Sequence, residues 1–214
     1  MGILVAIEGL DGAGKRTIVE RIETTARERG LTVATTAFPQ YGRSVEADVA
    51  AEALHGRHGD LSGSAYAMAM LFALDRHRSV EWLRQSCRRN DLVLCDRYVS
   101  SNAAYSAARL DQGPDGDVVR WVHDLEFERF ELPLPDHQLL LGVPPEVAMA
   151  RAEGRAAQDA SRAKDAYERD AGLQTRVYRA YLDLAESEWA SPWTVADGDQ
   201  AVQAVLGLLP QSLA

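Results

Sequence analysis

Cysteine is scarce in this chain, and the sequence also has no long apolar segment and no linker rich in proline, glycine and serine. Two cysteines, Cys87 and Cys95, are too few for a disulfide framework, which is typical of a protein of the reducing cytoplasm. The longest apolar stretch, residues 65–74, is too short to span a membrane. Met1 leads directly into an apolar segment, so we expect no signal peptide. We therefore expect one cytoplasmic domain over residues 1–214.

Positive charge is also in deficit, because 32 acidic residues outnumber 23 basic ones and the formal net charge is -9. A nucleic-acid polymer needs a broad basic surface, so this composition argues against such a partner. It does not exclude nucleotides, since a few arginines and backbone amides suffice for a small anion. Lysine is almost absent, because Lys15 and Lys164 are the only two in the chain.

A glycine-rich turn follows the apolar residues 3–8 and ends in one of these two lysines. Glycines let successive backbone N–H groups point at one anion, and the helix predicted after the turn directs its positive dipole end at the same anion. Lys15 adds a positive charge for the β and γ phosphates of a nucleoside triphosphate. We interpret the turn as a phosphate-binding loop made of Gly9, Leu10, Asp11, Gly12, Ala13, Gly14, Lys15, Arg16 and Thr17.

One residue departs from the usual form of this loop, because Arg16 stands where a serine or threonine normally follows the lysine. Either Thr17 supplies that hydroxyl to magnesium, or the metal is held mainly by carboxylates and by the phosphates themselves. An ordinary strand-to-helix turn is the alternative interpretation. The apolar run before the turn and the helical spacing after it favour the phosphate-binding loop.

Short apolar runs without alternation predict strands that are covered on both faces, as in a parallel sheet. They occupy residues 3–8, 33–37, 92–96, 137–143 and 193–195. Helical patterns lie at residues 14–29, 44–55, 64–90, 100–110, 115–130, 145–156, 164–188 and 199–209. This alternation predicts an α/β fold, a five-stranded parallel sheet surrounded by helices, with ligands at the carboxyl ends of the strands.

A carboxylate and a guanidinium, Asp96 and Arg97, follow the third predicted strand. After a phosphate-binding loop, an acid at this place can orient magnesium directly or through water. Arg97 is suited to a bidentate grip on a second phosphate group. The alternative is a mutual surface ion pair of the two residues, which would contribute little.

Several further segments complete a recognisable pattern together with these motifs. They are the Phe38-Pro39-Gln40-Tyr41-Gly42 turn, Phe72 with Arg76, Tyr98, Ser101, Asn102, Tyr105, Arg155, Arg162 and Asp165-Ala166-Tyr167-Glu168. Over nearly its whole length the chain resembles the bacterial form of the thymidylate kinase family. The resemblance implies a P-loop NTPase-like three-layer α/β/α fold and ATP-dependent phosphorylation of dTMP to dTDP with Mg2+. It also implies a homodimer that uses helical surfaces such as residues 64–90 and 115–130.

For dTMP, the resemblance implies that Phe72 stacks on the pyrimidine and that Arg76 donates to its O4. A core phenylalanine and a solvated arginine are the alternative interpretation of that pair. Asn102 and Tyr105 would contact the base edge and crowd the 2′ position, which favours deoxyribose. The other implied dTMP contacts are Asp11, Phe38, Tyr41, Arg97, Ser101 and Tyr167. A helix cap is the alternative role of the serine, and a rigid connector that of the Phe38 turn.

The arginine-rich and alanine-rich segment near residues 150–164 is interpreted as a lid, with Gly154 as a flexible point. The resemblance implies that Arg155 and Arg162 fold over the ATP phosphates and stabilise the transferred group. Arg151 and Arg155 stand four apart on one predicted helix face, so surface ion pairs are the alternative.

The resemblance also implies a metal and a mechanism. The implied metal ligands are Asp11, Asp96, Asp165 and Glu168. As acids at a helix start, the last two can equally serve the helix dipole. The implied catalytic residues are Lys15, Asp11, Arg97 and Arg155. They would align a dTMP phosphate oxygen for in-line attack on the γ-phosphorus of ATP.

Three other functions stay open at this point. Another nucleoside monophosphate kinase would share the loop, the strand-end Asp-Arg pair and the lid, and would differ in the base that it selects. A GTP-binding switch would carry an Asn-Lys-x-Asp motif, which the chain lacks. A nucleotide sensor without activity would bind ATP and form no dTDP.

Overall fold

A five-stranded parallel sheet forms the centre of the computed structural model, which describes residues 2–158 and 165–209, without the side chains of residues 155–158. The strands are β1 (Ile3–Glu8), β2 (Val33–Ala37), β3 (Leu92–Asp96), β4 (His137–Leu141) and β5 (Trp193–Ala196). They lie in the order β2-β3-β1-β4-β5, and each neighbouring pair is parallel. The predicted five-stranded parallel sheet is confirmed.

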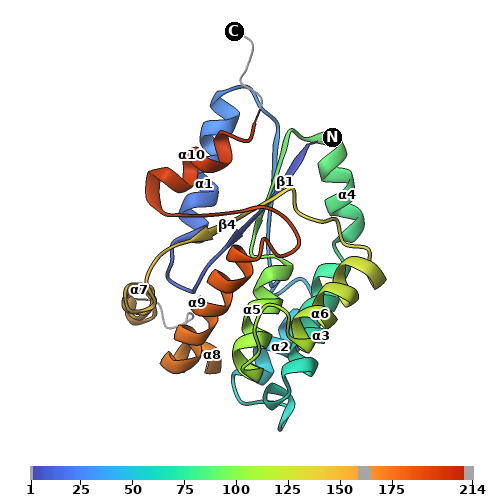
Figure 1. Cartoon of the computed structure of the whole chain (residues 1–214), viewed down its shortest axis with the longest axis vertical. Helices are drawn as coiled ribbons and strands as arrows, with labels where there is room; N and C mark the ends of the chain where they lie inside the picture. Colours follow the sequence, from blue (N-terminus) through green and yellow to red (C-terminus); the bar gives the residue numbers. More distant parts are fainter. Residues whose placement is uncertain (1, 159–164, 210–214) are drawn as a thin grey trace.

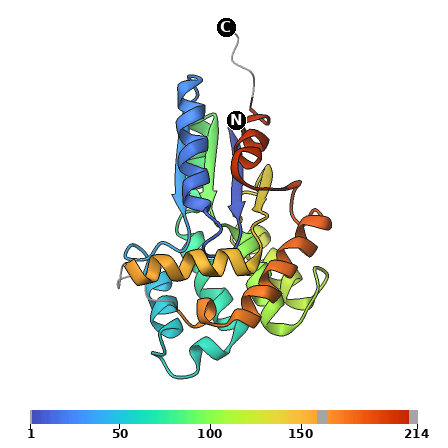
Figure 2. The ribbon, with the colours of Figure 1, turned by 90° about the vertical axis from the view of Figure 1, so that its left-hand side faces the viewer.

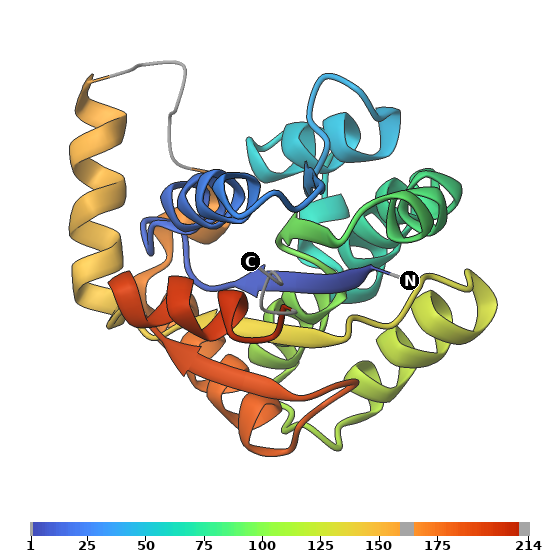
Figure 3. The same cartoon turned by 90° about the horizontal axis from the view of Figure 1, so that it is seen from above.

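Helices cover both faces of this sheet, so that helices, sheet and helices form three layers. They are α1 (Lys15–Glu28), α2 (Val45–Leu54), α3 (Ala65–His77), α4 (Val80–Arg89), α5 (Val99–Leu110), α6 (Asp117–His123), α7 (Pro145–Gln158), α8 (Ala166–Arg169), α9 (Ala171–Glu186) and α10 (Gly198–Leu206). Two shorter segments are η1 (Leu61–Gly63) and the π-helical η2 (Asp124–Arg129). Helices α1 and α10 pack together on one side of the sheet and α4 lies on the other (Figure 1, Figure 3).

The central strands are apolar on both faces because both faces are covered. Val5, Ala6, Ile7, Leu94 and Cys95 have no exposed surface. No alternation of polar and apolar residues is therefore needed in these strands, and each contributes to the core on two sides. Among the described residues, no helix is long and apolar enough to cross a bilayer.

The register of the strands brings their carboxyl ends to one edge of the sheet. Ile7 of β1 lies opposite Asp96 of β3 and Leu139 of β4. Figure 2 shows this edge facing the lower, helical half of the molecule, with α7 running across beneath it. The loops that follow β1, β3 and β4 therefore converge where a ligand is expected in an open α/β sheet.

Two predicted helices are each divided in the structure. The helix predicted over residues 64–90 is interrupted at Arg78 and Ser79 between α3 and α4. The helix predicted over residues 164–188 becomes α8 and α9, because Asp165 and Asp170 each accept a hydrogen bond from a backbone N–H three residues later. Such N-caps start a new helix at the residue that follows, whatever the longer periodicity predicts.

Candidate active site

The loop predicted to bind phosphate connects β1 to α1. Gly12 has φ of 92° and Gly14 of 95°, in the left-handed region that favours glycine. The Lys15 ammonium turns back into the loop and donates to the carbonyl oxygens of Gly9 at 3.1 Å and Leu10 at 3.0 Å. The loop therefore folds around the ammonium of its own lysine.

Burial and charge both act on this ammonium. Burial, and after it the positive charge of Arg97, lower the pKa of Lys15 to about 8 against the opposing effect of Asp11. The Asp11 carboxylate lies 3.8 Å from the Lys15 Nζ. A phosphate anion arriving here would add negative charge and favour the protonated lysine.

A cleft borders the outer side of the loop. Its lining includes the loop residues Gly12, Ala13, Gly14 and Thr17, the α7 residues Arg151 and Gly154, and Asp197 with Gly198 before α10. The helix dipole of α1 begins here as well, so loop amides, dipole and Arg151 all favour an anion.

Arg16 points away from this cleft in the described structure. Its Nε donates to Glu20 Oε1 at 2.7 Å, and 79% of the side chain is exposed. Thr17 lines the cleft instead. The position of Thr17 is compatible with the first of the two interpretations, in which its hydroxyl replaces the one that the loop lacks at position 16.

Arg97 joins the loop to the end of β3. One terminal nitrogen, Nη2, donates to Asp11 Oδ1 at 2.7 Å, and Nη1 donates to Ser101 at 3.1 Å and to Tyr181 at 3.2 Å. Burial favours the neutral guanidinium, but Asp11, together with Tyr105 and Tyr181, holds the pKa of Arg97 well above its ordinary value. The ion pair of Arg97 is therefore with Asp11 across the site, and the alternative pairing with Asp96 does not form.

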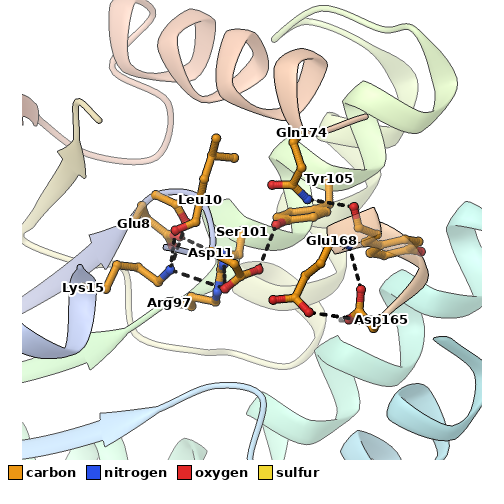
Figure 4. A network of polar contacts seen from close by, with 12 residues as sticks. Glu8, Leu10, Asp11, Lys15, Arg97, Ser101, Tyr105, Asp165, Glu168 and Gln174 are labelled. Carbon is orange, nitrogen blue, oxygen red and sulfur yellow. Dashed lines mark hydrogen bonds and ion pairs between the residues drawn. The ribbon is translucent and has the colours of Figure 1, made fainter. Parts of the chain in front are cut away.

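Glu8 supports this cluster and was not identified from the sequence. It has no exposed surface and accepts hydrogen bonds from the Tyr98 backbone N–H at 2.8 Å, the Ser101 hydroxyl at 2.6 Å and the Tyr181 hydroxyl at 3.0 Å. Ser101 thus binds Glu8 rather than capping α5 (Figure 4). The available signal was one acid at the end of an otherwise apolar strand.

A second cavity gathers every residue predicted to contact dTMP. Its lining is Asp11, Phe38, Pro39, Tyr41, Leu54, Phe72, Arg76, Arg97, Ser101, Asn102, Tyr105, Asp165 and Tyr167. Phe38 is almost fully buried in the wall, whereas Tyr41 is 50% exposed at the rim. Asp11 lines this cavity, and the next residue, Gly12, lines the cleft beside the loop. The cavity and the cleft are therefore separated by a single turn of backbone.

Arg76 is buried at one end of this cavity. It is 2% exposed and pairs with Glu126, with its Nε 2.5 Å and its Nη2 2.7 Å from the carboxylate oxygens. Asn102 donates to the same carboxylate at 2.7 Å. The alternative of a solvated arginine is therefore wrong. Glu126 was also missed, because an acid within an amphipathic helical pattern carries no distinguishing signal.

Aromatic rings form another wall of the cavity. Tyr105 and Tyr167 are stacked with centroids 5.8 Å apart, and the Arg97 guanidinium lies 5.7 Å from the Tyr105 centroid. The Arg109 guanidinium lies 5.1 Å from the Tyr167 centroid, and Gln174 donates to the Tyr167 carbonyl at 2.9 Å. Burial raises the pKa of Tyr167 to about 12. Burial also raises the pKa of Tyr105. Both tyrosines are therefore neutral at physiological pH, and their rings lie nearly parallel beside the cavity.

Two acids at the start of α8 form a capping box. Asp165 Oδ1 accepts from the Glu168 N–H at 2.8 Å, and Glu168 Oε2 accepts from the Asp165 N–H at 3.1 Å. Burial raises the pKa of both carboxyls, and the negative charge of Asp11 raises them further. The helix-start role is therefore present, and the same repulsion shows that three carboxylates share one region (Figure 4).

Asp96, the fourth predicted metal ligand, stands at the end of β3. Its charge raises the pKa of Lys15, which places it close to the loop. Within residues 2–158 and 165–209, no three acid, imidazole or thiol groups are arranged as ligands of one metal ion. Of the predicted lid residues, Arg155 contributes its backbone to α7, while its side chain and all of Arg162 lie outside what is described.

Comparison with known proteins identifies the family of this chain. Residues 7–206 match the thymidylate kinase family. The chain is 55% identical over 197 residues to the thymidylate kinase of Mycobacterium tuberculosis strain H37Rv, covering 92% of each chain. It is 32% identical over 206 residues to that of Bifidobacterium longum strain NCC 2705, covering 95% of this chain and 93% of the relative. A probable thymidylate kinase of Thermococcus gammatolerans is 35% identical, covering 87% and 84%. The chain therefore belongs to the thymidylate kinase family.

Proposed function

We propose that the two adjoining sites of this chain hold ATP and dTMP end to end for phosphoryl transfer. Family membership gives the reaction, ATP-dependent phosphorylation of dTMP to dTDP. The observation that supports the assignment of sites is the position of Asp11 and Gly12, consecutive residues of which the first lines the cavity and the second lines the cleft beside the loop. In this proposal the two phosphate groups bind on either side of one turn of backbone, and their reacting atoms approach to about 3–3.5 Å.

Lys15, the loop amides and Arg97 would hold the two anions in line despite their repulsion. An oxygen of the dTMP phosphate forms a bond to the γ-phosphorus while the bond to the β,γ-bridging oxygen breaks, and ADP leaves with that oxygen. The attacking phosphate is already ionised near neutral pH, so the site needs no general base. Asp11 then acts by orienting Arg97, as its 2.7 Å ion pair indicates. Positioning and charge stabilisation account for most of the rate.

Mg2+ suits the acids of this site by chemistry, because Asp11, Asp165 and Glu168 are oxygen donors whose mutual repulsion a cation would relieve. Magnesium usually takes one or two carboxylates and completes its shell with water and phosphates, so a preformed group of three is not required. We infer that it is held by Asp11, Asp96, Asp165 or Glu168 together with the nucleotide. When bound, it neutralises charge on the β and γ phosphates.

The far end of the cavity would bind the base and sugar. Phe72 and Phe38 offer apolar walls, Arg76 and Asn102 offer polar groups for the base edge, and Tyr105 restricts the sugar. Tyr41, Ser101 and Tyr167 complete the predicted contacts around the nucleotide. The lid would add Arg155 and Arg162 over the ATP phosphates, and Arg151 already borders that cleft.

We also infer that the chain, one domain over residues 1–214, works as a homodimer in the cytoplasm. Both cysteines are free and buried, as suits a reducing compartment. Tyr66 of α3 is 41% exposed and packs edge-to-face on Trp121 of α6 with centroids 5.0 Å apart, so the two helices present an aromatic surface. Interfaces between protein chains are enriched in such aromatic residues.

Steady-state kinetics with dTMP, dUMP, UMP, CMP and AMP tests the proposed use of the cavity. We expect the highest kcat/KM for dTMP and a large loss for each ribonucleotide, because Tyr105 crowds the 2′ position. A ribonucleotide with the highest kcat/KM would contradict the assignment of this cavity.

A further inference from the structure

The buried acid Glu126 faces both side chains that are expected to touch the base. It lies in the π-helical segment η2, has no exposed surface, and binds Arg76 of α3 and Asn102 of α5. The backbone of η2 is unusual here, because the Phe130 N–H donates to the Leu125 carbonyl five residues earlier. π-helical turns occur frequently at functional sites.

The neighbours of Asn102 fix which way its side-chain amide points. Its Nδ2 donates to the Ala69 carbonyl at 2.9 Å and to Glu126 Oε1 at 2.7 Å, and both partners are pure acceptors. The amide therefore has one allowed orientation, with nitrogen toward Glu126 and Oδ1 on the opposite side. In the described part of the chain, Oδ1 accepts no hydrogen bond and is not an enclosed unpaired atom, and Asn102 lines the cavity. Oδ1 is thus an acceptor open to a ligand.

Glu126 fixes the Arg76 guanidinium in the same way. The Glu126 carboxylate accepts hydrogen bonds from Nε at 2.5 Å and from Nη2 at 2.7 Å. The remaining nitrogen, Nη1, makes no hydrogen bond to any described residue and is not enclosed, and Arg76 lines the cavity. Burial opposes the charge, but Glu126, with a smaller contribution from Asp75, raises the pKa of Arg76. Nη1 is thus a permanent donor open to a ligand.

We propose that Glu126 is a specificity-determining positioning residue, which sets a donor on Arg76 beside an acceptor on Asn102. This pair complements the imide edge of thymine or uracil, where O4 accepts and N3–H donates. Cytosine carries the reverse pattern, an amino donor at C4 and an acceptor at N3, and would leave both protein groups mismatched. Buried polar groups left unpaired are costly, so fixing their orientation rejects the wrong base.

This inference rests on the proposed function, in which Arg76 and Asn102 meet the base. A merely structural role for Glu126 predicts a different result. Removing one partner of a buried ion pair would then lower stability and reduce activity on every nucleotide by the same factor. The ratio between two bases separates the two roles, because only a residue that sets donor and acceptor directions changes it.

The test replaces the carboxylate by an amide, Glu126→Gln. The new NH2 group cannot accept a hydrogen bond, so either Arg76 or Asn102 loses an acceptor, and the Asn102 amide keeps only the Ala69 carbonyl to orient it. The matched control is Glu128→Gln, the same chemical change at an exposed residue of η2. kcat/KM is measured for dTMP and dCMP with wild type and both variants, and folding is checked by thermal unfolding.

We expect wild type to prefer dTMP over dCMP, and Glu126→Gln to lower kcat/KM for dTMP by roughly tenfold or more, mainly through KM. We expect the dTMP to dCMP ratio to fall by about the same factor, with Glu128→Gln unchanged. If folded Glu126→Gln keeps the wild-type dTMP to dCMP ratio, the role proposed for Glu126 is wrong, while the proposed base contacts of Arg76 and Asn102 are not affected. A wild type without preference for dTMP would overturn the proposed base contacts themselves.

Glu126→Asp serves the same purpose if the glutamine variant does not fold. It keeps the charge for Arg76 but withdraws the carboxylate by one methylene, which weakens its hold on Asn102. We expect the dTMP to dCMP ratio to fall here too. A ratio equal to that of wild type would again overturn the role of Glu126.

Discussion

At the scale of single residues, the site depends on charged groups that are kept out of water. Lys15 and Arg97 are both buried, and each is held by Asp11 or by backbone carbonyls. Arg97 keeps its charge because the partner is a carboxylate. Lys15 has mainly neutral carbonyl partners, and burial lowers its pKa to about 8. The two cations therefore respond differently to pH.

The first prediction concerns ATP binding between about pH 7 and pH 9.5. In the proposed function the protonated lysine binds phosphate, and the protonated fraction of Lys15 falls as the pH rises through about 8. ATP affinity should therefore be constant on the acid side and fall above pH 8, approaching about tenfold per pH unit. Calorimetric titration measures this, and Lys15→Arg, which stays charged, should flatten the alkaline limb. Equal slopes in both proteins would contradict the assignment to Lys15.

The second prediction concerns the choice of sugar. Tyr105 lines the cavity and is held in place by stacking on Tyr167. Tyr105→Ala should open space for a 2′-hydroxyl, so that the kcat/KM ratio of dUMP to UMP falls by roughly tenfold or more. Tyr105→Phe keeps the ring and should keep the ratio. If alanine leaves the ratio unchanged, the ring does not exclude the ribose.

At the scale of elements, the loop between β1 and α1 packs closely against α7. A Cβ added to Gly12 would lie 1.9 Å from the Ala148 carbonyl oxygen of α7, whereas one added to Gly14 would meet no atom within 4 Å. Both glycines have φ in the left-handed region. Glycine at position 12 therefore serves backbone approach as well as conformation.

The third prediction uses this pair of glycines. Gly12→Ala and Gly14→Ala share the cost of a left-handed residue, about 1–2 kcal/mol. Gly12→Ala should lower the free energy of unfolding by a further 1–3 kcal/mol or so, because loop and α7 must separate. Urea unfolding of both variants measures the difference. Equal losses would show that α7 does not rest on the loop at residue 12.

Local sequence predicts the elements better than the contacts between them. The strands were predictable because buried parallel strands are short apolar runs, and the loop because its glycines and lysine are spaced for an anion. The break at Asp170 was not, since the helical pattern continues across it and only the capping geometry reveals it. Glu8 and Glu126 were missed because their roles arise from partners distant in the chain.

At the scale of the whole molecule, strand order creates the site. The chain leaves β1 toward β2 on one side and later returns to place β4 on the other, so β1 lies between β3 and β4. Residues as far apart as Asp11, Arg97 and Asp165 meet at this point where the order reverses. Pattern along the sequence does not set that order, so the shared cavity could be predicted only through the family resemblance.

The last prediction concerns assembly of two such molecules through α3 and α6. Across a twofold axis the same surface meets itself, so Tyr66→Glu would bury two unpaired carboxylates near each other. We expect wild type to sediment at twice the mass of one chain and Tyr66→Glu at the mass of one. Leu182→Glu on α9 is the matched control, because Leu182 is similarly exposed at 37% and lies outside residues 64–90 and 115–130, and it should remain dimeric. A dimeric Tyr66→Glu variant together with a monomeric Leu182→Glu variant would place the interface on α9, and a monomeric wild type would exclude the dimer.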